Sequence, residues 1–374
     1  MKTLKLFIIA VVLFLSGIQY LSSQTEIVKE SRKAQVTFTY PLGSEGVSSR
    51  SYSYNFSLNV LLGLNGGVNG FELGSLWNHN DGDVNGVQLS GIVNSTTGNS
   101  SGLILSGLVN YNYHAASAVA ISGILNYSRE YLRGVLLSGI ANIGLDSLNG
   151  ISVSGILNLT NGNARGIHLS TINLAKDFEG VQIGVVNSAR RLKGLQAGVI
   201  NVIEDGKNAL PIGLINIVRN GYYELDLAGG EAIYSNLNFK MGVERLYSIL
   251  KLGYSFYQDN PVYSFGFGLG TSVSLTERQS LNIELSTNRI FMDINRDWFE
   301  TSNELNKLDL NYKFYILNKL SFLIGPSYNV YVTEKKINGE YGTINIPYTL
   351  YEHEYASKKL FMWIGLNAGV SFKF

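Results

Sequence analysis

The sequence predicts an all-β protein, and the architecture it favours is a transmembrane β-barrel. Three observations lead to this: an apparent export signal at the N-terminus, long strands with one continuous apolar face in the C-terminal third, and a near-regular repeat of 14–16 residues between them. The favoured architecture is one antiparallel outer-membrane barrel of about 20 strands, with the repeats as consecutive strands. The alternative is a barrel of about ten strands with the repeats inserted as a β-solenoid.

Residues 1–23 have the composition of a secretory signal peptide. Lys2 and Lys5 precede the apolar run 6–15, and the small residues Ser22 and Ser23 follow it. This order of a basic region, an apolar region and a small-residue cleavage site directs export. We therefore expect cleavage after Ser23. Because the chain contains no cysteine, disulfides and thiolate metal sites are excluded.

Composition narrows the class of protein further. Charged residues make up 15% of the chain, below the roughly 25% of an average soluble domain. The formal net charge of +1 is too small to indicate binding of nucleic acid, which requires a clear excess of positive charge. No mature segment is apolar over the ~18 residues that a membrane helix needs.

The segment 359–374 alternates strictly, and its even-numbered residues from Leu360 to Phe374 form one almost entirely apolar face. A period of two identifies a strand, and its length exceeds the common ~5–6 residues. The segments 52–64, 262–275, 305–317 and 319–333 alternate in the same way. Long apolar-faced strands joined by alternating short turns and long polar loops are typical of transmembrane barrels, whereas a soluble β-sandwich would have shorter strands.

The chain ends in an aromatic residue on the apolar face of its last strand. Phe372 and Phe374 resemble the terminal signal of bacterial outer-membrane barrels, which implies recognition by the barrel assembly machinery. The resemblance further implies a periplasmic C-terminus and surface exposure of residues 292–304 and 334–358.

The middle of the chain contains ten repeat units, each marked by an asparagine. Successive asparagines are 16, 16, 16, 16, 16, 15, 14, 14 and 15 residues apart. A glycine three residues before the asparagine allows a bend or close packing in the 16-residue units. The structural residues predicted for the repeat are Asn78, Asn94, Asn110, Asn126, Asn142, Asn158, Asn173, Asn187, Asn201, Asn216, Gly91, Gly107, Gly123, Gly139 and Gly155.

Two arrangements of the units remain open. In a solenoid each unit is one coil, the asparagines stack in a ladder, and all linkers look alike because every coil repeats one geometry. In a barrel each unit is one strand and one turn. Strand-like alternation and Asn-Gly or Asp-Gly linkers such as Asn161-Gly162 favour the barrel slightly. Nine straight residues cover ~30 Å, so a solenoid coil would need a bend, for which Gly91 and its equivalents are suited.

The array resembles bacterial surface-repeat proteins of leptospires and Bacteroidetes, whose unit reads Gly-x-Gln-x-(Ala/Ser)-Gly-x-x-Asn. The segments 86–94, 180–187 and 194–201 match best, the last two being one residue shorter. The resemblance covers residues 70–221 and implies a surface or outer-membrane location without catalytic residues. Other residues stand at the Gln position in many units, including Ile104 and His168, which weakens any hypothesis of a ligand-binding glutamine row.

No catalytic or cofactor-binding motif emerges. The four histidines share no motif spacing, and His168 is expected to be an ordinary strand residue. Asp293, Asn295, Asp297 and Glu304 have the spacing of some EF-hand ligands, but Trp298 stands where the loop needs glycine. A solvated loop is the simpler interpretation, and we expect no metal or cofactor.

The domain prediction is therefore a signal peptide (1–23), N-terminal barrel strands (24–69), a ten-unit repeat array (70–221) and C-terminal barrel strands (222–374). The expected function is that of a non-enzymatic outer-membrane surface protein with a structural, adhesive or host-contact role. Its expected partners are outer-membrane lipid, the barrel assembly machinery and an unidentified surface ligand. The alternative function is a passive diffusion pore or transport channel.

Overall fold

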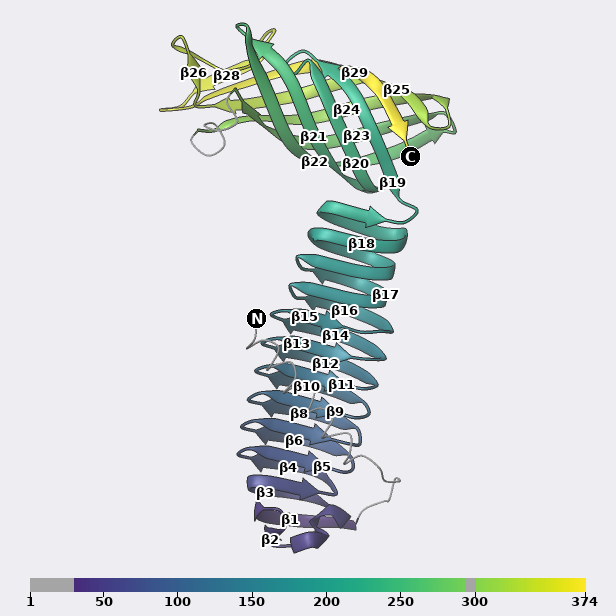
Figure 1. Ribbon diagram of the computed structural model, residues 1–374, viewed down its shortest axis with the longest axis vertical. Coiled ribbons are helices and arrows are strands. Elements are labelled where there is room, and N and C mark those ends of the chain that lie inside the picture. The colour runs from purple at the N-terminus through teal and green to yellow at the C-terminus, as the bar shows by residue number, and fades with distance from the viewer. Residues whose placement is uncertain (1–29, 293–300) are drawn as a thin grey trace, which may run out of the picture. The chain divides into compact units, whose positions relative to one another are not determined.

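The computed structural model describes residues 30–292 and 301–374. The signal-peptide prediction for residues 1–23 lies outside them. The chain divides into two compact units, Met1–Gly184 and Val185–Phe374. The first contains stacked coils, and the second contains the last coils and a closed barrel (Figure 1).

The coils form a β-solenoid built almost wholly from parallel pairs of strands. Most coils contain one longer and one shorter strand, and β18 runs through more than two coils. The elements are β1 (Glu30–Thr39), β2 (Leu42–Gly43), the 3-10 helix η1 (Gly46–Ser51), β3 (Tyr52–Asn65), β4 (Gly67–Gly74), β5 (Trp77–Asn80), β6 (Val84–Ser90), β7 (Val93–Thr96), β8 (Ser100–Ser106), β9 (Val109–Asn112), β10 (Ala116–Ser122), β11 (Leu125–Ser128), β12 (Tyr131–Ser138), β13 (Ala141–Gly144), β14 (Ser147–Ser154), β15 (Leu157–Leu159), β16 (Asn163–Leu169), β17 (Ile172–Ile183) and β18 (Val186–Val218).

The parallel register corrects the prediction that the repeats are consecutive antiparallel strands of a twenty-strand barrel. Leu89 of β6 pairs with Leu105 of β8, and Leu105 pairs with Ile121 of β10. Each partner is 16 residues further along the chain, so one repeat unit is one full coil. The chain turns back at the Ser-Gly bend after the longer strand, which makes a straight membrane-crossing strand impossible there.

The predicted N-terminal barrel strands also belong to the solenoid. β1 pairs in parallel with β3, and β3 pairs in parallel with both β4 and β5. β2 folds back antiparallel against the end of β1. Segment 52–64 alternates like a barrel strand, but its partners are coils of the array.

The barrel contains eight antiparallel strands and closes between its first and last, β19 and β29. The barrel of about ten strands in the alternative prediction is an overestimate, because the predicted N-terminal barrel strands belong to the solenoid. The elements are β19 (Tyr222–Gly230), β20 (Ser235–Val243), β21 (Leu246–Tyr257), β22 (Asn260–Thr276), β23 (Gln279–Phe291), β24 (Asn303–Leu317), β25 (Leu320–Thr333), β26 (Lys336–Ile337), β27 (Glu340–Tyr341), β28 (Tyr351–Glu354) and β29 (Lys359–Lys373).

The two ends of the barrel differ in their connections. The turns 244–245, 277–278 and 318–319 lie at one end, which we call the turn end. The segments 231–234, 258–259 and 334–358, with Met292 and residues 301–302, lie at the other, the loop end, where β26 and β27 form a hairpin and β28 pairs antiparallel with the start of β29. The chain enters the barrel at Tyr222 and finishes after β29, and both points lie at the turn end.

Removing one asparagine amide tests whether the solenoid depends on its interior. Asn126→Ala removes the acceptor of one Asn110 amide N–H and the side-chain donor to the Leu137 carbonyl, at a cost of about 1–3 kcal/mol for each buried group. We expect a lower urea midpoint, followed by far-UV circular dichroism. The control Asn163→Ala, at an exposed position of β16, should leave the midpoint unchanged. Equal midpoints for the two variants would contradict this account.

Candidate functional site: solenoid core and barrel interior

The repeat asparagines form a hydrogen-bonded ladder inside the coils of each unit. Asn110 Nδ2 donates to Asn126 Oδ1 at 2.9 Å, and Asn126 Nδ2 donates to Asn142 Oδ1 at 2.8 Å. In the first unit the ladder runs from Asn59 to Asn173, and in the second from Asn187 to Asn216. All ten predicted asparagines are at most 1% exposed. The side chains point into the core and stack in the ladder that the solenoid alternative predicts.

Each ladder asparagine from Asn78 to Asn158 also donates to a backbone carbonyl of the following coil. Asn94 Nδ2 donates to the carbonyl of Leu105, and Asn126 Nδ2 donates to the carbonyl of Leu137. Asn59 begins the ladder, but the repeat spacing does not predict it, because it lies 19 residues before Asn78. Since these amides are used within the core, the ladder is structural and offers no free row of groups to a ligand.

The predicted glycines occupy the bend where neighbouring coils approach most closely. A Cβ on Gly107 would lie 1.9 Å from the Gly91 carbonyl oxygen, and one on Gly123 would lie 2.1 Å from that of Gly107. Gly139 and Gly155 are similarly confined. Real Cβ atoms do not approach backbone oxygen this closely, so the fold requires glycine in this column.

The most unusual group in the solenoid core is the carboxyl of Glu72, which is 0% exposed. Its two oxygens accept hydrogen bonds from the amides of Asn59, Asn65, Asn80 and Gln88, at 2.7–3.1 Å. Burial raises the pKa of Glu72 to about 7, although the four amides act in the opposite direction. No sequence pattern points to this site, because Glu72 occupies the Gln position of an atypical first repeat.

His168 occupies the same column six coils later, and it is 1% exposed. Its ring lies edge-on to Phe178, with 4.9 Å between centroids. Burial lowers the pKa of His168 to about 4, so the ring is neutral at pH 7. The expectation that His168 is an ordinary strand residue fits this packing.

The loop end of the barrel is filled by an apolar cluster. Trp363 and Tyr331 are 0% exposed and point inward. Tyr331 Oη donates to Asn303 Oδ1 at 2.5 Å and contacts Thr343 Oγ1 at 3.1 Å, which ties segment 334–358 to the wall. The cluster comprises Ala232, Ile233, Val262, Ile290, Leu305, Tyr331, Ile344, Phe361 and Trp363.

The rest of the interior is dominated by paired charges. Lys240 lies 2.6 Å from Asp226 and 2.5 Å from Glu284, and Lys313 pairs with Glu224. All five side chains are at most 2% exposed. Tyr247 Oη donates to Glu284 at 2.9 Å. Such charges are tolerated in an interior only when they are paired and hydrogen-bonded.

A second polar layer lies nearer the middle of the barrel. Lys251 and Lys307 both approach Asp309, at 3.4 and 3.5 Å, and Asn367 Nδ2 donates to Asp309 at 2.8 Å. The cavity beside this layer has a volume of only about 10 Å³, about one water molecule. Side chains of these two polar layers thus fill this part of the interior.

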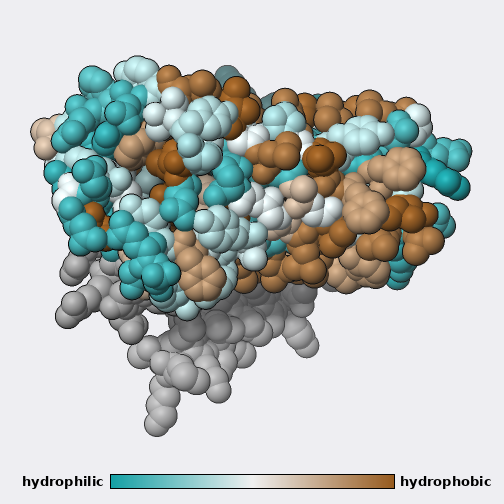
Figure 2. Space-filling view, turned by 90° about the horizontal axis from the view of Figure 1, so that it is seen from above, coloured by the Kyte–Doolittle hydropathy of each residue, from teal (hydrophilic) through white to brown (hydrophobic). Residues whose placement is uncertain are grey.

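The outer wall of the barrel has the opposite polarity. Leu285 is 63% exposed, Leu366 57% and Phe265 40%, and their neighbours along each strand point inward. Figure 2 shows hydrophobic residues over this wall and hydrophilic ones gathered at the loop end. Aromatic residues cluster near both ends of the apolar wall: Tyr254, Phe256, Tyr263 and Tyr328 towards the loop end, and Phe314, Phe322, Phe372 and Phe374 towards the turn end.

The predicted assembly residues lie in the second of these aromatic groups. Phe374 is 62% exposed and packs edge-on against Phe372, with 5.2 Å between centroids. The Phe374 amide donates to the Tyr223 carbonyl at 3.1 Å, so the terminal residue remains attached to the first barrel strand.

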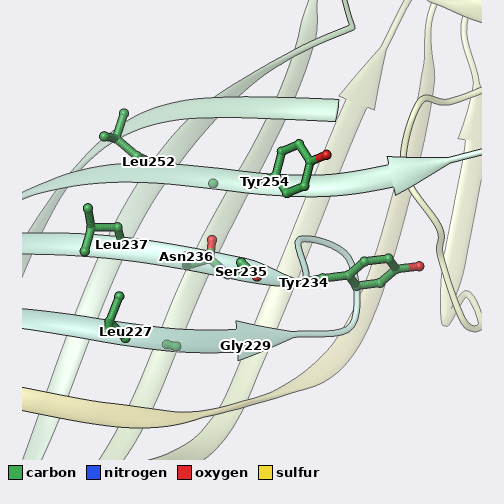
Figure 3. Close-up of a pocket in the computed structure, with 10 residues that line it drawn as sticks. Leu227, Gly229, Tyr234, Ser235, Asn236, Leu237, Leu252 and Tyr254 are labelled. Carbon is green, nitrogen blue, oxygen red and sulfur yellow. The ribbon is translucent and has the colours of Figure 1, made fainter. Parts of the chain in front are cut away.

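A shallow hollow of about 460 Å³ interrupts the wall across β19, β20 and β21 (Figure 3). Leu227, Leu237 and Leu252 line one side, Tyr234 and Tyr254 flank the other, and the small residue Gly229 leaves the space between them. No charged side chain lines the hollow. A wall of this chemistry suits a hydrocarbon chain better than a water-soluble ligand.

No metal centre is found among residues 30–292 and 301–374, where no group of three acidic or histidine side chains could hold an ion. Asp293, Asn295 and Asp297 of the EF-hand-like pattern lie outside the described residues. Glu304, its remaining member, pairs with Arg289 at 3.0 Å. In the same described part of the chain, no helix is long and apolar enough to cross a membrane.

Comparisons with known proteins identify no relative: no family model, no curated protein and no solved structure matches this chain.

The Glu72 site predicts a measurable dependence of stability on pH. Because its folded pKa of about 7 exceeds the usual 4.5, stability is highest below pH 4.5 and falls as pH rises towards 7. The loss is about 3 kcal/mol at most. In Glu72→Gln this loss should disappear. The free energy of unfolding of this variant, relative to the unmodified chain, should therefore increase between pH 4.5 and 7.

Urea unfolding at several pH values measures this difference. His168 contributes equally to both proteins, so the comparison isolates Glu72. The control Glu204→Gln changes an exposed solenoid carboxyl and should keep the pH profile of the unmodified chain. Parallel profiles for Glu72→Gln and the unmodified chain would refute the assignment.

Proposed function

We propose that the chain is a non-enzymatic outer-membrane protein in which the barrel is a membrane anchor and the solenoid is a structural arm. The observation that carries the proposal is the inverted polarity of the barrel. Its interior holds paired charges, whereas Leu285, Leu366 and similar side chains face outward. In water this arrangement would expose a continuous apolar wall, whereas in lipid the same wall lies against hydrocarbon. Closure of the barrel pairs the backbone groups of the strands with one another, which lipid requires.

The dimensions of the wall support a membrane location. On β22, outward-facing residues run from Tyr263 to Val273. Ten residues at ~3.3 Å, tilted by ~40°, span roughly 25 Å, which matches the apolar band of outer-membrane barrels. An even number of strands, short turns at one end and aromatic residues at both borders belong to the same pattern.

The export signal predicted at residues 1–23 and the terminal Phe374 favour a bacterial outer membrane over other membranes. In such barrels the short turns face the periplasm and the long loops face outward. Because the chain enters the barrel at the turn end, this orientation puts the solenoid in the periplasm. Segment 334–358 then carries any adhesive or host-contact role at the cell surface. In this orientation the repeats do not face the outside of the cell, although their resemblance to surface-repeat proteins implies a location at the cell surface or in the outer membrane.

A diffusion pore is the less well supported alternative. Eight strands enclose an interior just wide enough for side chains. Here that interior holds the Trp363 cluster and the ion pairs around Lys240 and Asp309. We therefore propose a closed anchor.

Topology is tested by cysteine labelling, since the chain has no cysteine of its own. We expect Gly339→Cys, in the loop-end hairpin, to react with a membrane-impermeant maleimide on intact cells. Asn163→Cys, at an exposed solenoid position, should react only after the outer membrane is disrupted. Labelling of Asn163→Cys on intact cells would show that the solenoid faces outward and contradict the proposed orientation. A protein that does not sediment with membranes would contradict the proposal of a membrane anchor.

The closed interior predicts no stable conductance. The purified chain should give no stable single-channel currents in planar lipid bilayers, because charged and apolar layers fill the barrel. Insertion must be established separately, by flotation of the same preparation with vesicles. Large, stable currents from protein that also floats would favour the pore.

A further inference from the structure

An uninterrupted apolar surface follows the first unit of the solenoid on the outside of its longer strands. One column of it, the leucine column, contains Leu73, Leu89, Leu105, Ile121, Leu137, Val153, Leu169 and Ile183, which are neighbours in register. Beside it lies the valine column: Val87, Leu103, Val119, Val135, Ile151, Ile167 and Val181.

A third column lies beyond the Ser-Gly bend. It contains Leu76, Ile92, Leu108, Ile124, Ile140 and Ile156, and each amide from Ile92 onward donates to the carbonyl of the residue before it in the column. We call this the isoleucine column, and the three columns together the apolar stripe. Leu108 is 41% exposed and Ile156 51%, and no residue of the stripe carries a charge.

The surface of the stripe is stepped. Between the leucine and isoleucine columns the Ser-Gly bends have little side-chain volume. Here a groove of about 560 Å³ runs along the leucine column from Leu58 to Ile121, with Ser90 and Gly91 among its lining residues. An exposed apolar column thus lies beside a recessed apolar floor on the same molecule, which is the arrangement that a self-complementary surface needs. Because the coils are equally spaced, the same contact can repeat from coil to coil along two solenoids.

The area of the stripe reaches the least that a specific dimer interface needs. The valine and leucine columns lie two residues, ~7 Å, apart and run side by side over seven coils at ~4.8 Å, and the leucine and isoleucine columns lie three residues, ~10 Å, apart and run side by side over six coils. The stripe thus covers about 500 Å² on each copy, so a pair buries about 1,000 Å², near the smallest area of specific interfaces. Exposed apolar patches of several hundred Å² mark interaction surfaces.

We propose that the apolar stripe is a homodimer interface, in which the solenoids of two copies of this chain pack face to face with each isoleucine column in the groove of the other. The absence of charge from the stripe favours this partner over one recruited by charge complementarity. A two-fold axis through such an interface brings the central coils of the two copies together, whether the two solenoids run parallel or antiparallel.

Cysteine cross-linking of the full chain tests the interface. Ile124→Cys and Leu108→Cys place single thiols on the central isoleucine column, and Ser117→Cys places one at an exposed position on the other side of the valine column. The two column variants are reconstituted together in lipid vesicles and treated with a short bismaleimide. We expect a covalent dimer on a denaturing gel from the column variants, at a yield that does not fall on dilution with lipid, and none from Ser117→Cys.

A second substitution distinguishes packing from collision. Leu105→Asp added to the Ile124→Cys chain should abolish the cross-link, whereas Ser101→Asp should leave it intact, and circular dichroism should show the same β content in both. Cross-linking that survives Leu105→Asp, or is equal for Ser117→Cys, overturns the proposal. Reaction of the column with a lipid-phase photoprobe in place of cross-linking would assign the stripe to a lipid surface. The cross-link can equally be read in buffer, so failure of the membrane anchor would not be mistaken for failure of the dimer.

Discussion

The solenoid depends on one constraint: the asparagine amides buried in its core must be hydrogen-bonded, and their partners lie in the next coil. The asparagine ladder meets this requirement, because each amide from Asn78 to Asn158 donates both to the following asparagine and to a carbonyl of the following coil, as do Asn187 and Asn201. An aliphatic side chain at this position would leave a bend carbonyl unpaired in the interior, which is costly. Parallel stacking also fixes the repeat length, since any extra residue must be accommodated in a linker.

The same constraint explains why the glycines accompany the asparagines. The ladder holds adjacent coils so close at the bend that the Gly91 carbonyl occupies the space where a Cβ of Gly107 would lie. Asparagine and glycine therefore form one structural unit: the first binds the bend to the next coil, and the second allows the bend to come near enough. The barrel solves the corresponding problem differently, by closing β19 on β29 so that neither strand has an open edge.

Much of the barrel could be predicted from sequence, because strands such as 359–374 combine polar-apolar alternation with unusual length, and few folds other than a membrane barrel require both. The repeats could not be assigned in the same way. Val87 and Leu89 alternate with Gln88 whether the strand crosses a membrane or forms one side of a coil. The uniform linkers and the need for a bend at Gly91 are the two signals that favour the solenoid. Segment 52–64 is a strand, as its alternation predicts, but alternation does not identify the partner of a strand.

The candidate sites were even less accessible to sequence analysis. Glu72 aligns with Gln88, and only the fold shows that Asn59, Asn65 and Asn80 converge on its carboxyl. The ion pairs of the barrel join residues far apart in the chain, such as Lys313 and Glu224, so no local pattern announces them. A buried charge can be predicted only when the three-dimensional fold shows which partners compensate it.

The column that contains Glu72 shows how the solenoid accommodates variation. Gln88, Ile104, Ala120, Leu136, Ser152 and His168 follow it in register, so one position holds acidic, amide, aliphatic and aromatic side chains. In a stack, each residue contacts mainly the coils immediately before and after it, and must match only those neighbours. The polar residues accordingly gather at the two ends of the column, with Ile104, Ala120 and Leu136 between them. The asparagine position has no such freedom, because its hydrogen bonds run through every coil and a single aliphatic replacement breaks the ladder on both sides.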